Sequence, residues 1–202
     1  MEIPYLSDEK IKKIAGDFRT KFSGNSIPIE MEDIIELKLK MYIALSPGLK
    51  YLHGIDMLIT SDFKSIYVDE NIYSDETQKN RLRFSYAHEI GHFVLHKNIY
   101  KKLGIKDWQD LCSAQEKESY QKNIKRINKQ ADIFAGYLLV PEERLEIEKN
   151  QILESLDTKL LSKIESISKE RLNQLLTSQL STIFGVSQMA MFIALEKLEN
   201  KK

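Results

Sequence analysis

The pentapeptide His88-Glu-Ile-Gly-His92 constrains this chain more than any other feature. It lies in an apolar stretch over residues 83–96 that is compatible with a helix. Residues four apart on a helix are displaced by about 40° round the axis and ~6 Å along it. Two imidazoles at that spacing can bind one metal ion. The sequence therefore predicts a helix from about residue 76 to residue 96, with His88 and His92 as ligands of one divalent ion.

Glu89 lies about 100° round the same helix from His88 and is not an obvious ligand. It can reach the open coordination position beside the histidines, which is the place of the general base in H-E-x-x-H zinc peptidases. The H-E-x-x-H pattern also occurs by chance in unrelated sequences. Here its context favours a metal site, because three of the four histidines of this chain lie within nine residues. His96 stands about 12 Å from His88 along the helix, so we expect it to be hydrogen-bonded rather than a third ligand. We expect Zn²⁺ as cofactor and Glu89 as the catalytic residue.

The rest of the chain predicts an α+β fold. Alternation with period two indicates three strands, and we expect them to form a small antiparallel sheet. Apolar residues at helical spacing follow Ser7, a predicted N-cap, and dominate the chain again beyond residue 123. Residues 97–120 are polar and are predicted to be a surface excursion. The predicted strands cover residues 39–45, 55–60 and 65–69, and the further helices cover residues 8–22, 28–37, 123–139, 153–164, 172–183 and 187–198.

Composition excludes some classes of protein. Thirty basic and thirty acidic residues cancel, so no overall field attracts the chain to nucleic acid or to anionic lipid. The longest apolar run, residues 189–195, is far too short to span a bilayer, and the first residues do not resemble a secretory signal. Cys112 is the only cysteine, so no intrachain disulfide is possible. We expect a soluble, cytoplasmic protein with no membrane partner.

Four segments resemble the ImmA/IrrE family of metallo-endopeptidases and together span most of the chain. They are Ile66-Tyr-Val-Asp-Glu70, Arg83-Phe-Ser-Tyr-Ala-His-Glu-Ile-Gly-His-Phe-Val-Leu-His96, Gln130-Ala-Asp-Ile-Phe-Ala-Gly-Tyr-Leu-Leu-Val-Pro141 and Phe184-Gly-Val-Ser187. The resemblance implies a zincin-like minidomain, a small sheet plus the metal-binding helix, in residues 1–150. A helical C-terminal extension, residues 151–202, would pack on it. The family resemblance also implies an endopeptidase that cleaves a helix-turn-helix repressor and so derepresses genes of a phage, another mobile element or a stress response.

One position departs from the family pattern. The third zinc ligand of the family is a Glu, and the matching residue here is Asn128, whose amide oxygen is a weaker donor. Asp132 lies one helical turn further on, where such sites place a carboxylate that accepts the second N–H of a ligand histidine. Three outcomes follow: a weak site of His88, His92 and Asn128, a shift that makes Asp132 the third ligand, or a relic that has lost its metal.

Three further features have competing interpretations. Glu116 and Glu118 become candidate ligands if the loop around them folds inward. The strand at residues 65–69 could pair with an extended substrate if it lies at a sheet edge. Arg81 and Arg83 are most simply interpreted as solvated or paired surface charges.

A DNA-binding regulator is the main alternative to a peptidase. Residues 179–195 have the spacing of a helix-turn-helix, with Gly185 in the turn. The recognition helix would be residues 187–198, and its only cation is Lys197, whereas DNA affinity relies on many Lys and Arg side chains. We therefore expect no direct contact with nucleic acid. A sensor or binding protein without catalytic activity, on the same fold, is the third hypothesis, and Asn128 favours it.

Overall fold

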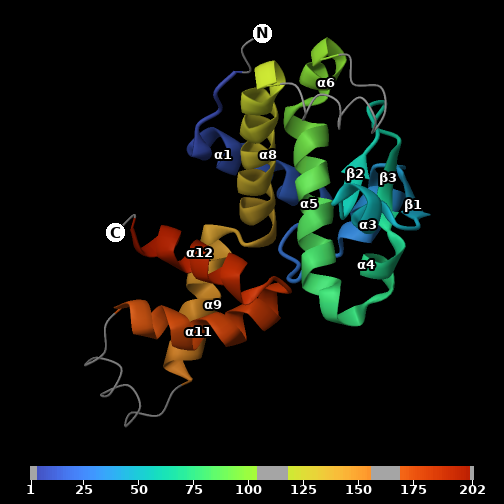
Figure 1. Ribbon diagram of the computed structural model, residues 1–202. Helices are drawn as coiled ribbons and strands as arrows, with labels where there is room; N and C mark the ends of the chain where they lie inside the picture. The colour runs from blue at the N-terminus through green and yellow to red at the C-terminus, as the bar shows by residue number, and fades with distance from the viewer. Residues whose placement is uncertain (1–3, 104–117, 156–168, 201–202) are drawn as a thin grey trace. The chain divides into compact units, whose positions relative to one another are not determined.

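The structure is a computed structural model that describes residues 4–103, 118–155 and 169–200 (Figure 1). It confirms the predicted α+β class, because a three-stranded sheet accompanies a mainly helical chain. The chain forms two compact units. The first comprises residues 1–25 and 30–138, and the second comprises residues 26–29 and 139–202. The domain boundary at residue 150 stays a prediction.

The sheet of the first unit is mixed, with the order β1-β3-β2. β1 (Tyr42–Ser46) runs parallel to β3 (Ser65–Asp69), and β2 (Met57–Ile59) runs antiparallel to it. The expectation of an all-antiparallel sheet is therefore wrong. Its physical reason is a short helix, α3 (Leu49–His53), which carries the chain from β1 to the far side of the sheet. Glycines with positive φ flank this helix at both ends, where a side chain would be strained.

The central position of β3 also corrects a second expectation. Because β1 and β2 already pair with its two sides, β3 offers no free edge to an extended substrate. β2 is the edge strand that packs against α5 (Lys79–Leu95), the helix that carries His88 and His92.

Side-chain caps mark three helix starts in the first unit. Ser7 caps the first helix by accepting a hydrogen bond from the Lys10 amide at 3.4 Å. Asp69 caps the helix after β3, and Asp75 caps the 3₁₀ turn that leads into α5. These helices are α1 (Asp8–Phe22), α2 (Met31–Asp33) with the π-helix η1 (Ile34–Lys38), α4 (Glu70–Ser74), the 3₁₀ helix η2 (Glu76–Gln78) and α5 (Lys79–Leu95).

The segment predicted as a surface excursion begins as a helix, α6 (Lys97–Leu103); Lys97 and Asn98 are exposed, but Tyr100 departs from the prediction. Its Tyr100 is only 3% exposed, because its ring packs on Phe63 and on His92. Residues 104–117, which include Cys112 and Glu116, lie outside the described residues. The chain continues as α8 (Glu118–Leu139).

The second unit is helical. Its helices α9 (Glu142–Glu154), α11 (Lys169–Phe184) and α12 (Gln188–Glu199) bury apolar residues, among them Leu145, Phe184 and Leu195. α9 lies upstream of the helix predicted at residues 153–164, most of which falls outside the described residues. Gly185 ends α11 with a φ of 60°, and Ser187 caps α12 as predicted.

No single helix in the described ranges is both long and apolar enough to cross a membrane. The segments Leu172–Phe184 and Gln188–Glu199 pass that test of length and composition only as a pair, and the chain bends by 114° between them.

α5 and α8 of the first unit lie side by side (Figure 1), and they meet at Gly91. A Cβ atom on Gly91 would lie 3.1 Å from the Cα atom of Ala131 and 3.2 Å from its carbonyl oxygen. Both residues are buried, and the neighbouring α8 residues Ile127 and Phe134 are fully buried as well. Glycine therefore lets the two helix backbones approach more closely than a side chain would without a local shift.

We predict that Gly91→Ala lowers the free energy of unfolding by about 1–3 kcal/mol, because the added methyl group meets backbone that cannot move alone. The matched control is Gly136→Ala on α8, where a Cβ atom would meet nothing within 4 Å. That change should be neutral or stabilise by up to about 1 kcal/mol, as alanine favours a helix. Urea denaturation of both variants measures the difference. Equal stabilisation of the two would contradict the close packing at Gly91.

Candidate metal centre

The three residues of the motif lie on α5, as the spacing predicts, and face one cavity of about 340 Å³. The Nε2 atoms of His88 and His92 are 3.0 Å apart. Asn128 and Asp132 of α8 line the same cavity. The packing of α5 on α8 thus brings together all the residues that the sequence proposed for the metal site, apart from those in the loop before α8.

Asp132 forms a hydrogen bond with the Nδ1 atom of His88, the ring nitrogen that does not face His92. The distance between His88 Nδ1 and the Asp132 Oδ1 atom is 2.8 Å. A carboxylate can only accept, so the Nδ1–H of His88 donates and leaves the Nε2 lone pair free. This is the geometry expected of a carboxylate that orients a ligand histidine.

His92 is oriented by a longer chain of hydrogen bonds that the sequence did not reveal. The Gln130 amide nitrogen donates to the Pro4 carbonyl at 3.2 Å, which turns its Oε1 atom towards His96. His96 Nε2–H donates to that oxygen at 2.9 Å, so His96 Nδ1 is an acceptor. His92 Nδ1 lies 3.1 Å from it and must donate. The lone pair of His92 is therefore on Nε2, the atom that faces His88.

Two nitrogen lone pairs thus point at each other across the cavity, which is unfavourable until a proton or a metal cation lies between them. Tetrahedral Zn–N bonds of ~2.0–2.1 Å separate two nitrogen ligands by roughly 3.3–3.4 Å, close to the spacing found. The arrangement fits a metal ion, and His96, whose nitrogens are both engaged, is no ligand.

Burial disfavours the protonated, charged form of a histidine ring. It lowers the pKa of His92 well below its usual value, and His88 and His96 nearby add to the effect. It also lowers the pKa of His96 to about 4. Burial acts in the same direction on His88, but the hydrogen bond with Asp132 and the charges of Glu89 and Asp132 outweigh it and raise its pKa. Of the three, His88 is therefore the ring that holds a proton most readily when no metal is bound.

Glu89 is 7% exposed, and its Oε2 atom accepts a hydrogen bond from the Ile59 amide of β2 at 2.8 Å. Burial raises the pKa of this carboxyl to about 7, although His88 and the Ile59 amide act in the opposite direction. A base whose pKa lies near the working pH is suited to accept and return a proton. The edge strand β2 therefore fixes a carboxylate of that kind beside the two histidines.

The described side chains do not supply a third ligand of the usual type. Among them, no three His, Cys, Asp or Glu residues are grouped so that they could hold one metal ion. Asn128 contacts the His92 ring, and this contact opposes the fall in the pKa of His92. Glu118 begins α8, but its side chain lies outside what the structure describes. The amide of Asn128, which lines the cavity and interacts with His92, is thus a candidate for a third donor.

Charged residues at the rim of the cavity were not predicted as part of the site. Asp56 pairs with both Lys50 and Arg81, and all three line the cavity. Arg81 is a paired, half-exposed charge, as expected. Arg83 differs from the expectation of a surface charge, because it is only 8% exposed and donates to Asn80 at 3.3 Å.

The chain matches a model of a known protein family. The family model Peptidase_M78, described as the IrrE N-terminal-like domain, matches residues 43–195. The matched segment begins in β1 and ends in α12, so it contains the whole candidate centre. No curated protein matches the chain.

The chain of hydrogen bonds from Gln130 predicts opposite tautomers for His92 and His96, which lie one helical turn apart. In metal-free protein, His92 should carry its proton on Nδ1 and His96 on Nε2, because the orientation of Gln130 fixes both. Long-range ¹⁵N–¹H correlation spectra distinguish the two forms. Gln130→Leu should release His96 and mix the tautomers of both rings. Identical tautomers in the unaltered protein would show that this chain does not orient His92.

Proposed function

The chain belongs to the Peptidase_M78 family, and from this premise we propose that it is a zinc-dependent endopeptidase with Glu89 as general base. The observation that carries the proposal is the pair of facing Nε2 lone pairs, 3.0 Å apart, beside a buried carboxylate in one cavity. His88, His92 and the amide of Asn128 would hold the ion. At this position zinc supplies a Lewis acid that polarises a peptide carbonyl and makes water more acidic.

The protein residues divide the remaining work. Asp132 fixes the tautomer of His88 and His96 fixes that of His92, so that both Nε2 lone pairs are aimed at one point. Glu89 takes a proton from the attacking water and returns it to the leaving amine, for which its raised pKa is suited. The Ile59 amide holds the carboxylate in place through one oxygen, so the other oxygen is available for the proton.

A helix-turn-helix repressor is the proposed substrate, on the strength of the family resemblance. Two features are compatible with a polypeptide substrate. The edge strand β2 borders the cavity through Met57 and Leu58, and an extended segment could pair beside it. The charged rim formed by Lys50, Asp56 and Arg81 would meet the side chains of that segment. The protein would act on the repressor rather than on DNA.

One geometric observation favours the DNA-binding alternative: α11 and α12 meet with a bend of 114°, within the range of helix-turn-helix pairs. The charges of α12 oppose it. Glu196 accepts a hydrogen bond from Asn173, Glu199 pairs with Lys149, and exposed apolar side chains of α12 include Met189 and Ile193. Such a surface suits contact with protein better than contact with phosphates. A metal-free sensor on the same fold remains the alternative to an active enzyme.

We predict that Glu89→Gln keeps the bound zinc but abolishes proteolysis, with a loss of at least ~10²-fold, because an amide cannot accept the proton of water. Cells that produce the unaltered protein or the variant are compared by mass spectrometry of newly formed N-termini. New termini in a DNA-binding repressor should arise only with the unaltered protein. Zinc content, measured on both purified proteins, is the control for an intact site. Equal cleavage by a zinc-loaded Glu89→Gln variant would disprove the role of Glu89.

Asn128→Glu should raise zinc affinity, because a carboxylate oxygen is a normal third ligand of catalytic zinc and adds a negative charge. We expect a gain of at least tenfold in the association constant, measured by calorimetry against a competing chelator. If Asp132 is already the third ligand, the added Glu should change affinity little, and Asp132→Ala should abolish binding. If neither change alters zinc uptake, residues 128 and 132 do not serve the site, and the proposed ligand set is wrong.

A further inference from the structure

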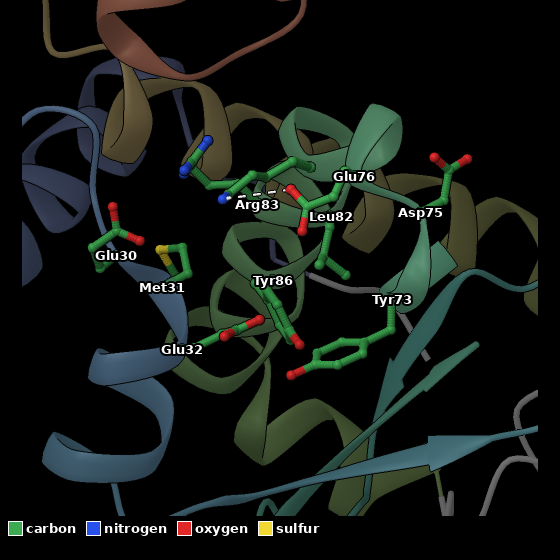
Figure 2. A pocket seen from close by; sticks show the side chains of 10 residues that line it. Glu30, Met31, Glu32, Tyr73, Asp75, Glu76, Leu82, Arg83 and Tyr86 are labelled. Carbon is green, nitrogen blue, oxygen red and sulfur yellow. Dashed lines mark ion pairs between the residues drawn. The ribbon is translucent and has the colours of Figure 1, made fainter. Parts of the chain in front are cut away.

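A second cavity of about 270 Å³ lies in the first unit, and it shares no lining residue with the metal centre (Figure 2). Its walls come from α2, from the segment that joins α4 to η2 and from the first half of α5. Met31, Leu82 and the rings of Tyr73 and Tyr86 form its apolar part. Neither the metal centre nor the proposed proteolysis uses this space.

The hydroxyl of Tyr86 is buried without a hydrogen-bond partner among the described residues. The side chain is 1% exposed, and in Figure 2 its hydroxyl points towards the carboxylate of Glu32 and the hydroxyl of Tyr73. Burial raises the pKa of Tyr86, and the Glu32 carboxylate adds to the effect through its charge and as a nearby acceptor, although no acceptor among the described residues forms a hydrogen bond with the hydroxyl. An unpaired buried hydroxyl costs about 1–3 kcal/mol, so a group that bonds to it would be stabilising.

The cavity also has more negative charge than its own cations balance. Four carboxylates line it, against Lys79 and Arg83. Lys79 pairs with Glu76 at 3.8 Å, and the Asp75 carboxylate accepts hydrogen bonds from the amide and the hydroxyl of Thr77.

Neither of the remaining two carboxylates, Glu30 and Glu32, forms an ion pair with any residue in the described ranges. Two carboxylates without an ion-pair partner among the described residues thus line the same cavity as two tyrosines, and the hydroxyl of one of these, Tyr86, has no hydrogen-bond partner there.

We propose that this cavity binds a small organic cation, a primary ammonium or guanidinium group on a short carbon chain. The cationic head lies between the carboxylate of Glu32 and the hydroxyl of Tyr86, to which it donates hydrogen bonds. The Tyr73 ring offers its face to the charge, and Met31 and Leu82 contact the carbon chain.

The size of the cavity limits the ligand. A volume of about 270 Å³ holds roughly nine waters at ~30 Å³ each, below the range of sites for drug-sized molecules. A four-carbon amine fits that space. The same chemistry is present in a free metabolite and in the Lys or Arg side chain of a polypeptide, and the two sources can be distinguished by experiment.

The test titrates the full-length protein with n-butylammonium and n-butylguanidinium, and follows binding by calorimetry and by the NMR signals of the tyrosine rings. Butanol and butyrate are the neutral and anionic controls. Both cations should bind saturably with a Kd of about 1 mM or below, and neither control should do so. A tripeptide with blocked ends and a central Lys compares the sources. Tighter binding of the tripeptide than of butylammonium indicates a polypeptide, and weaker binding indicates a free amine.

Two substitutions tie the binding to this cavity. Glu32→Gln and Tyr86→Phe should each weaken binding of the cations at least tenfold. Asp33→Asn is the matched control, because it removes the same charge from α2 at an exposed residue that does not line the cavity. Its Kd should stay within twofold of the unaltered protein. Without ligand, Tyr86→Phe should melt no earlier than the unaltered protein, since it removes a hydroxyl that has no partner.

Three results would overturn the proposal. The first is the absence of saturable binding by either cation, which would leave the cavity to water. The second is equal weakening by Glu32→Gln and Asp33→Asn, which would reduce the effect to general charge attraction. The third is binding of butanol as tight as that of butylammonium. The readout is binding alone, so the result does not depend on whether the protein is an active peptidase.

Discussion

The close approach of α5 and α8 at Gly91 and Ala131 is the constraint on which the candidate centre depends. The two helices are far apart in sequence, and the missing side chain at Gly91 lets their backbones meet without the shift that a Cβ atom would require. That contact sets the height of α8 along α5. As a result, Asn128 and Asp132 stand level with the histidines rather than a turn away. Precise placement of ligands requires rigid elements of this kind.

Around that contact, burial and hydrogen bonds set the protonation of the imidazoles: the pKa values of His92 and His96 are lowered and that of His88 is raised. Burial disfavours protonation of His92 and His96. The acceptor Asp132 fixes which ring nitrogen of His88 carries the proton, and the acceptor Gln130 does the same for His96. The same burial raises the pKa of Glu89. One physical effect, removal from water, therefore prepares ligands with free lone pairs and a carboxylate that can take up a proton near neutral pH.

α5 borders both cavities of the first unit. His88, Glu89 and His92 line one, whereas Leu82 and Tyr86 line the other. A side chain two residues along a helix points about 200° round the axis, so alternate residues of one short segment reach different walls. Every residue of α5 from Leu82 to Leu95 is buried or half-buried, so no side of this part of the helix is fully exposed to water.

The sequence by itself determined whatever depends on near neighbours. Helical spacing placed His88, Glu89 and His92 on one helix, and the pattern of segments identified the family and pointed to Asp132. Only the tertiary structure decided the order of the sheet, the Ile59 amide that holds Glu89, and the chain from Gln130 through His96 that fixes the tautomer of His92. The Ile59–Glu89 and His96–Gln130 contacts join residues 30 and 34 positions apart, and the order of the sheet depends on a crossover helix. No periodicity in a sequence encodes them, because periodicity records only which face of an element is buried and not what lies against it.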